Sequence, residues 1–159
     1  IEVLYGILKE EQPDVVICVG QAGGRPNITV ERIAINQDDA RIPDNDGKQP
    51  IDRTIFEEGP AAYFSTLPIK AMVRDMKEAG VPAAVSNTAG TFVCNHIMYG
   101  ALHYAALHQP NLKAGFVHIP YLPMQTVDKP TMPSMSRDEI VKTAIQVEED
   151  VKETGGAVC

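Results

Sequence analysis

The sequence lacks the features that would place it in several common functional classes. It has only 14 lysines and arginines against 21 aspartates and glutamates, which gives a net charge of −7. It therefore has no clustered positive charge for nucleic acid. No apolar run approaches the ~18–20 residues that a membrane span requires, and no repeat or low-complexity tract is present. We therefore expect neither a nucleic acid nor a membrane as a partner.

Cysteine is scarce as well. Cys18, Cys94 and Cys159 lie far apart and are odd in number. This pattern matches neither a disulfide framework nor the paired spacing of a zinc site. Free cysteines are typical of a reducing compartment, so we expect a cytoplasmic protein. No metal ion and no other cofactor is expected.

The residues that are present predict one α/β domain. The chain has 159 residues and is 44% hydrophobic, which is enough for a single core. Short apolar runs alternate with segments of helical periodicity, and two of these runs suit strands buried on both faces of a sheet. This order predicts a three-layer sandwich, in which helices cover both faces of a central, mostly parallel twisted sheet. Strands are expected at 13–20, 28–36, 81–86 and 114–120, helices at 1–11, 67–79, 92–108 and from a Ser136–Glu139 capping box to Gly155 and Gly156, and a long loop at 37–60.

A cysteine in the segment SNTAGTFVCNH (86–96) is a candidate nucleophile. Cys94 follows a strand and a sharp turn, and it lies in the first turn of the helix predicted at 92–108. A helix N-terminus carries about half a positive charge and several free amides. These groups favour a thiolate and can stabilise an oxyanion. The alternative is a structural role, because free cysteine is among the residue types most often buried in cores.

Four histidines are available as a base for such a thiolate. His118, in GFVHIPYLP, lies near the end of an apolar strand, and sites in open α/β sheets gather at the carboxyl ends of strands. His96 is two residues from Cys94 on one helix, so the two side chains point apart. His103 and His108 are expected on the surface or in packing. A histidine bonded to a backbone carbonyl in the core is an equally good interpretation of His118.

Two further features lie in the segment 20–36. Glu31 interrupts the apolar run ITVERIAIN, so it is either a surface ion-pair partner or a carboxylate that orients an imidazole. The preceding GQAGGR (20–25) is a weak phosphate-loop candidate, because its spacing is not G-x-G-x-x-G and no Lys-Ser/Thr follows. No helix follows it either. A backbone turn near a ligand is the better interpretation.

Three segments together resemble the pyroglutamyl peptidase I family, also called pyrrolidone-carboxylate peptidase. GQAGGRPNITVERIAIN and VSNTAGTFVCN are similar to its two signatures, and FVHIPYLP is similar to its histidine segment. The resemblance implies an α/β cysteine peptidase that removes N-terminal pyroglutamate from peptides without a metal. It also implies a cytoplasmic homo-oligomer, a dimer or a tetramer. It places Glu31, Cys94 and His118 at catalytic positions and Gln21, Arg41, Ile42, Phe92 and Val93 around the substrate ring.

The chain departs from the family at its start. Family members begin with a strand and a loop of the type G-F-x-P-F-G-G, which contributes apolar residues to the substrate pocket, and this sequence contains no such segment. We therefore expect residues 1–159 to form a single peptidase domain that lacks its N-terminal strand and loop. Two alternative functions stay open. One is a nucleoside phosphorylase-like transferase that uses GQAGGR for phosphate, and the other is an inactive fragment.

Overall fold

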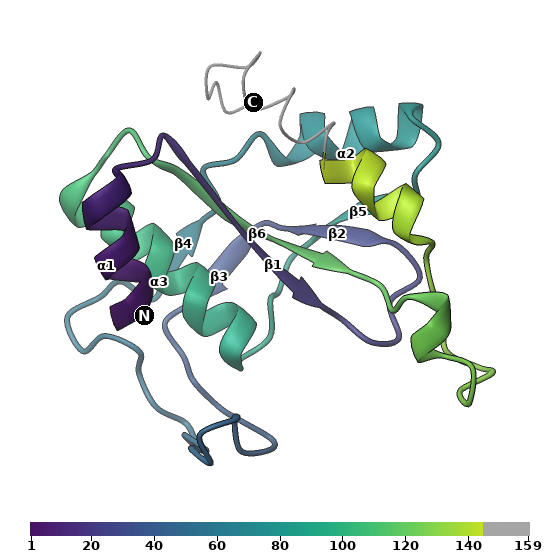
Figure 1. Ribbon diagram of the computed structural model, residues 1–159. Coiled ribbons are helices and arrows are strands. Elements are labelled where there is room, and N and C mark those ends of the chain that lie inside the picture. The colour runs from purple at the N-terminus through teal and green to yellow at the C-terminus, as the bar shows by residue number, and fades with distance from the viewer. Residues whose placement is uncertain (145–159) are drawn as a thin grey trace.

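A mixed four-stranded sheet lies at the centre of the molecule (Figure 1). The computed structural model describes residues 1–144. The strand order is β1 (Val15–Gln21), β6 (Lys113–Ile119), β2 (Ile28–Glu31) and β5 (Ala83–Ser86). β1 is parallel to β6 and β2 is parallel to β5, whereas β2 and β6 are antiparallel. The mostly parallel sheet expected from the sequence is therefore confirmed.

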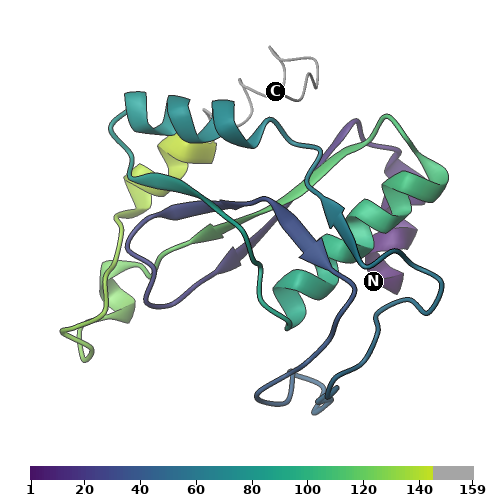
Figure 2. The same cartoon turned by 180° about the vertical axis from the view of Figure 1, so that it is seen from behind.

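Helices cover both faces of this sheet. α1 (Glu2–Glu11) and α3 (Val93–His108) lie on one side. α2 (Ile69–Glu78) and the helical residues 137–144 lie on the other side (Figures 1 and 2). This arrangement confirms the predicted three-layer α/β sandwich.

Local signals set the ends of two of these helices. Gly80 follows α2 with φ of 82°, a left-handed conformation that glycine adopts without strain. The predicted capping box is also formed, since the Glu139 amide donates to Ser136 Oγ at 3.3 Å and the Ser136 amide donates to the Glu139 carboxylate at 3.0 Å. The end predicted for this last helix, at Gly155 and Gly156, lies outside the described residues.

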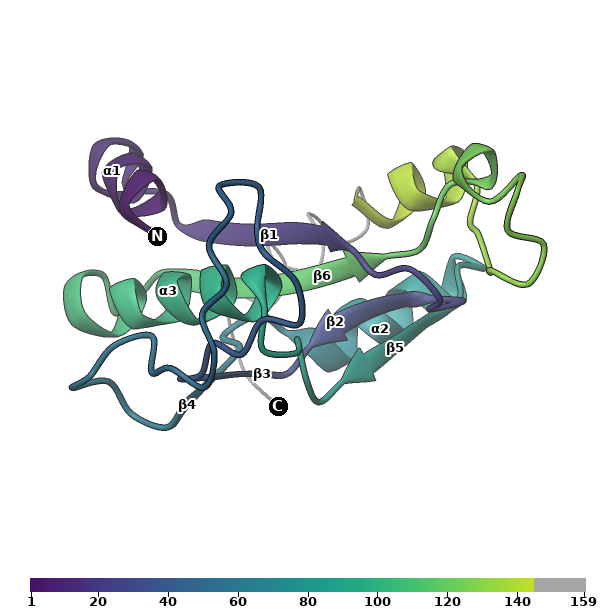
Figure 3. The same ribbon diagram turned by 90° about the horizontal axis from the view of Figure 1, so that it is seen from below.

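Residues 37–60 form the expected long loop, which leaves the sheet and passes beside the start of α3 (Figures 1 and 3). The loop leads into β4 (Ala62–Phe64), which pairs with β3 (Ile33–Ile35) in a separate two-stranded sheet. β4 was not predicted from the sequence, because a strand of three residues carries too little periodicity to be recognised. The continuous strand predicted at 28–36 is divided at Arg32 into β2 and β3.

The order of the strands corrects one expectation. The apolar runs at 13–20 and 81–86 were predicted to form strands buried on both faces. β1 and β5 are instead at the edges of the described sheet and only partly buried, and Val19 is 61% exposed. β6 and β2 occupy the centre and are buried. An apolar run indicates burial, but it carries no information on where a strand lies in the sheet.

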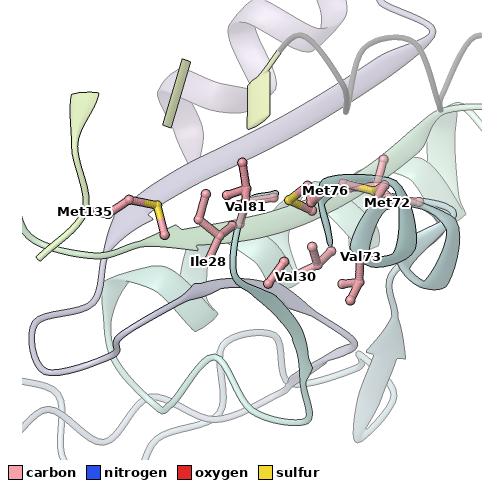
Figure 4. Close-up of a cluster of buried hydrophobic side chains, with 10 residues drawn as sticks. Ile28, Val30, Met72, Val73, Met76, Val81 and Met135 are labelled. Atoms are coloured by element: carbon pink, nitrogen blue, oxygen red, sulfur yellow. The ribbon is translucent and has the colours of Figure 1, made fainter. Parts of the chain in front are cut away.

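Alternation along the strands divides the core into two halves. Ile28 and Val30 of β2 point toward α2, where they pack against Met72 and Met76 (Figure 4). Phe116 of β6 points the other way, into a second cluster under α3. Successive side chains of a strand alternate between faces. Glu31 of β2 and His118 of β6 therefore both lie on the α3 face.

Candidate active site

His118 and Glu31 form the centre of the candidate site. Thr29 of β2 is directly opposite His118 of β6 in the antiparallel register, so Glu31, two residues further along β2, lies diagonally across from the imidazole. The Nδ1 of His118 donates to Oε1 of Glu31 at 2.8 Å. Glu31 is 0% exposed and His118 is 4% exposed. The pair is thus shielded from water, which strengthens its electrostatic coupling.

The pKa values of the two groups are displaced in opposite directions. Burial alone would raise the pKa of Glu31, but polar contacts with His118, Ser86 and Arg25 and the charge of Arg25 outweigh it, and the pKa is lowered. Burial alone would lower the pKa of His118. The hydrogen bonds and charges of Cys94 and Glu31 outweigh that effect, so the pKa of His118 is raised. The site therefore favours a carboxylate beside a basic imidazole.

Cys94 reaches this pair from the first turn of α3. Its thiol lies close enough to His118 to raise the pKa of the imidazole. The thiol also lies over Gly20, which is opposite His118 in the parallel register of β1 and β6. A Cβ at Gly20 would be 3.2 Å from Cys94 Sγ and 2.7 Å from Cζ of Phe116. The three residues assigned from the family resemblance as Cys94, His118 and Glu31 are thus brought together by three different elements.

The residue after the cysteine anchors this turn of the helix. Asn95 is 1% exposed, and its Oδ1 accepts from the backbone amide of Ile35 at 2.9 Å. Its Nδ2 donates to the carbonyls of Ile35 at 2.8 Å and Gln37 at 3.0 Å. Asn95 therefore fixes the start of α3 against β3. This role was not predicted from the sequence, although a polar residue next to Cys94 in an apolar helix was a signal for it.

The other histidines have different partners. His96 Nδ1 is 2.7 Å from Oδ2 of Asp38, in the long loop. His103 Nδ1 is 3.0 Å from the hydroxyl of Tyr63, and its ring stacks on a neighbouring aromatic side chain. His108 is exposed and packs its ring against an adjacent tyrosine. The expectation that His103 and His108 serve packing or lie at the surface is confirmed.

Three of the predicted substrate residues are close to the site in the sequence, since Gln21 follows Gly20 and both Phe92 and Val93 precede Cys94. Gln21, at the end of β1, forms a reciprocal amide pair with Gln125, with distances of 2.7 and 3.2 Å. Phe92 and Val93, at the start of α3, line a cavity of about 700 Å³ together with His96. Val93 is 50% exposed, so its side chain is available to a ligand.

Arg41 and Ile42 lie in the loop that passes beside α3, and both are exposed. This part of the loop is tied to the turn before Cys94, because the amide of Asp39 donates to the carbonyl of Thr91 at 2.8 Å. The hydroxyl of Thr91 donates back to the carbonyl of Asp39 at 2.9 Å. Arg41 and Ile42 therefore follow a segment of the loop that is fixed close to the nucleophile. Their contact with substrate stays a prediction.

The turn GQAGGR supplies a cation to the carboxylate of the site. Arg25 Nη1 donates to Oε1 of Glu31 at 2.6 Å and also to the hydroxyl of Thr29. Its Nη2 lies 3.4 Å from the carbonyl of Thr88, in the turn that precedes Cys94. From the sequence, this motif was a weak phosphate-loop candidate and was better interpreted as a backbone turn near a ligand, and no role was assigned to Arg25. The partner of its arginine becomes visible only when the strands are placed side by side.

We expect Gly20→Ala to damage the site, because the new methyl group would overlap the Phe116 ring and contact Cys94. Phe116 is 2% exposed and has little room to move. Overpacking of this kind costs about 1–3 kcal/mol, so a thermal melt is expected to show lower stability. Gly6→Ala is the control: a Cβ there meets nothing within 4 Å, and removal of a helical glycine stabilises by about 0.5–1 kcal/mol. Equal melting temperatures for the two variants would contradict this packing.

Two classes of feature are absent from the described part of the chain. Among residues 1–144, no helix combines the length and apolar character needed to cross a membrane. In the same residues, no three His, Cys, Asp or Glu side chains are grouped so that they could hold a metal ion.

Comparison with known proteins identifies the family. The pyroglutamyl peptidase family matches residues 1–153. The whole chain is 59% identical to the pyrrolidone-carboxylate peptidase of Alkaliphilus oremlandii and covers 78% of that protein. The crystal structure of pyroglutamyl peptidase I from Bacillus amyloliquefaciens superposes with a TM-score of 0.94 at 51% identity, over 97% of this chain and 74% of that one.

The pyrrolidone carboxyl peptidase from Thermococcus litoralis is a further structural match. Its TM-score is 0.93 at 42% identity, over 96% of this chain and 72% of that one. The chain thus spans about three quarters of the length of these relatives. The chain belongs to the pyroglutamyl peptidase family, whose members are cysteine-type exopeptidases.

Proposed function

We propose that the chain removes N-terminal pyroglutamate from peptides, with Cys94 as nucleophile, His118 as base and acid, and Glu31 as the carboxylate that orients the imidazole. One observation carries the assignment. His118 has Glu31 on its Nδ1 at 2.8 Å, and Cys94 from α3 lies close enough to raise the pKa of the same imidazole. A nucleophile, a base within hydrogen-bond reach and a group that fixes the base are the parts that covalent acyl transfer needs.

The reaction proceeds through a thioester. His118 accepts the proton of the Cys94 thiol, and the thiolate sulfur forms a bond to the exocyclic carbonyl carbon of the pyroglutamyl residue. The amides at the start of α3 lack intrahelical partners and stabilise the resulting oxyanion. The carbon–nitrogen bond then breaks as His118 returns the proton to the leaving amine. Water, deprotonated by His118, hydrolyses the thioester and releases pyroglutamate and free enzyme.

The character of the site suits the substrate. A pyroglutamyl group has no free α-amine, so its pocket needs no carboxylate for an ammonium. Its flat lactam fits an apolar wall such as Phe92 and Val93, with a few polar groups such as Gln21 to orient it. Arg41 and Ile42 are proposed to complete the enclosure from the loop.

The setting of the enzyme is also part of the proposal. We place the chain in the cytoplasm, since its mechanism requires a free thiol and Cys18 and Cys94 are both unpaired. We take it as a single domain, because helices on both faces pack on one sheet. A homo-oligomer, which the family resemblance implies, is expected, and its size is measured by light scattering. The chemistry described above needs no metal.

The phosphorylase-like alternative is disfavoured by the contacts of the turn it would use. Arg25, the cation of GQAGGR, is engaged by Glu31 at 2.6 Å, and the segment after the turn is a strand rather than a helix. Cleavage that requires phosphate would favour this alternative over the peptidase.

The direct test is hydrolysis of pyroglutamyl-aminocoumarin. Glutamyl-aminocoumarin is the matched control, because it has the same carbon skeleton with an open chain and a free α-amine. We expect release of aminocoumarin from the lactam substrate only, without added metal or phosphate. Equal hydrolysis of both substrates, or of neither, would contradict the proposal.

The pH dependence of this reaction follows from His118. Neutral imidazole must accept the thiol proton, and the pKa of His118 is raised above 6.5. The value of kcat/KM is therefore low at pH values below this pKa, and it increases with pH as the imidazole loses its proton. We expect the acid limb of the profile of kcat/KM against pH to have an apparent pKa above 6.5. A limb below that value would argue against His118 as the base.

A further inference from the structure

Two donors converge on a single oxygen of the buried glutamate. His118 Nδ1 lies 2.8 Å from Oε1 of Glu31, and Arg25 Nη1 lies 2.6 Å from the same atom. The other oxygen, Oε2, is buried and has no hydrogen-bond partner among residues 1–144. The hydroxyl of Ser86, which is near this carboxylate, donates instead to the carbonyl of Thr88 at 3.1 Å. The carboxylate thus depends on Oε1 for its strong contacts.

A fully buried carboxylate of this kind needs a cation to stay ionised. Transfer of an unpaired carboxylate out of water is so costly that such a group normally takes up a proton instead. In the described chain, Arg25 is the permanent positive charge in contact with Glu31. Its side chain is 31% exposed, so the guanidinium retains water on its outer side while it contacts a carboxylate that is 0% exposed.

The same guanidinium joins the segments that carry the site. It belongs to the turn between β1 and β2, it contacts Thr29 and Glu31 on β2, and it reaches the carbonyl of Thr88. Thr88 lies in the turn that leads into α3 and Cys94. One side chain therefore contacts both the glutamate and the turn that positions the nucleophile.

We propose that Arg25 is a positioning residue of the triad, which keeps Glu31 ionised and directs its Oε1 to His118. The proposal rests on the proposed function of the triad. Arg25 acts through Glu31 and touches none of the reacting atoms. Its positive charge also weakens the attraction of the Glu31–His118 pair for protons, so it determines the pH at which the imidazole becomes a base.

The groups that act on this pair come from every neighbouring element. His118 on β6 faces Cys94 from α3 and Glu31 from β2. Glu31 in turn faces His118, Arg25 from the turn and the hydroxyl of Ser86 from β5. Removal of a positive charge raises the proton affinity of each titratable group near it. The acid limb of activity is therefore expected to move to higher pH when the charge of Arg25 is lost.

The experiment compares Arg25→Gln, Arg25→Lys and Arg32→Gln by the profile of kcat/KM against pH on pyroglutamyl-aminocoumarin. Arg32, which lies between β2 and β3, is a matched control, because its Nε donates to Asn87 at 2.7 Å rather than to Glu31. Arg25→Gln is expected to move the acid limb up by about one pH unit. Below the limb its kcat/KM is then about tenfold lower than that of the unmodified enzyme. Arg25→Lys, which keeps the charge, is expected to restore the limb.

The position of the limb does not depend on how much of a variant is folded, so this readout separates electrostatics from stability. An unmoved limb in Arg25→Gln, even with reduced kcat, would overturn the proposal and leave Arg25 a structural residue. A limb that moves equally in Arg25→Lys and Arg25→Gln would overturn it as well. Cys94→Ala is assayed in parallel: its activity would refute the triad itself, whereas its inactivity beside an unmoved limb would refute only the role of Arg25.

Discussion

Cys94→Ala is expected to lower kcat on pyroglutamyl-aminocoumarin by about 10⁴-fold or more, because no other group can form the thioester. Cys94 is only partly buried, so loss of its sulfur leaves little cavity. The melting temperature is therefore expected to change little. The two measurements together separate loss of chemistry from loss of fold.

The matched control for this variant is Cys18, which lies in β1. Burial raises the pKa of the Cys18 thiol, so less of it is thiolate at neutral pH. We expect iodoacetamide to alkylate Cys94 before Cys18, with loss of activity in step with labelling of Cys94 in a peptide map. Cys18→Ala is expected to keep its activity. Full activity after alkylation of Cys94 would refute the mechanism.

His118→Ala is expected to lower kcat by ~10²–10⁴-fold, the usual contribution of a general acid and base. The loss arises because the thiol has no acceptor for its proton and the leaving amine has no donor. The variant also leaves Glu31 buried with Arg25 as its charged partner, so some stability is lost too. The kcat must therefore be expressed per mole of folded protein, measured by circular dichroism at the assay temperature.

His96→Ala is the matched control for the base. It is nearer to Cys94 along the chain, but its Nδ1 is engaged by Asp38 at 2.7 Å, away from the nucleophile. Only a small effect on kcat is expected from its removal. If His96→Ala proved more harmful than His118→Ala, the assignment of the base would have to be exchanged between the two residues.

Much of the fold could be predicted because most helices and strands have a recognisable pattern of apolar residues in their own local sequence. The helix from Val93 to His108 and the strand from Lys113 to Ile119 were located within one residue of their ends. The order of the strands could not be predicted, since an apolar run in β1 looks the same at an edge as in the centre. The three-residue strand β4 is stabilised by its pairing with β3, a contact between segments far apart in sequence.

The site was partly accessible from the sequence for a similar reason. Cys94, His118 and Glu31 stand out as reactive residue types in unusual local surroundings, and the resemblance to a family assigned them roles. Arg25 and Asn95 are different, because each acts through partners on other elements. An arginine in a glycine-rich turn or an asparagine in an apolar helix can indicate a buried polar contact, but it does not identify the partner. Their roles emerge only from the contacts of Arg25 with β2 and of Asn95 with β3 in the folded chain.

The three hydrogen bonds of Asn95 have a consequence for motion in solution. They tie the backbone around the nucleophile to β3, through the amide and carbonyl of Ile35. A local opening that detaches residues 38–60 from the turn at Thr91 therefore leaves the first turn of α3 in its place. The amide of Ile35 exchanges its hydrogen with solvent only when α3 itself separates from the strand. The backbone at the nucleophile is therefore expected to exchange its amide hydrogens more slowly than the loop beside it.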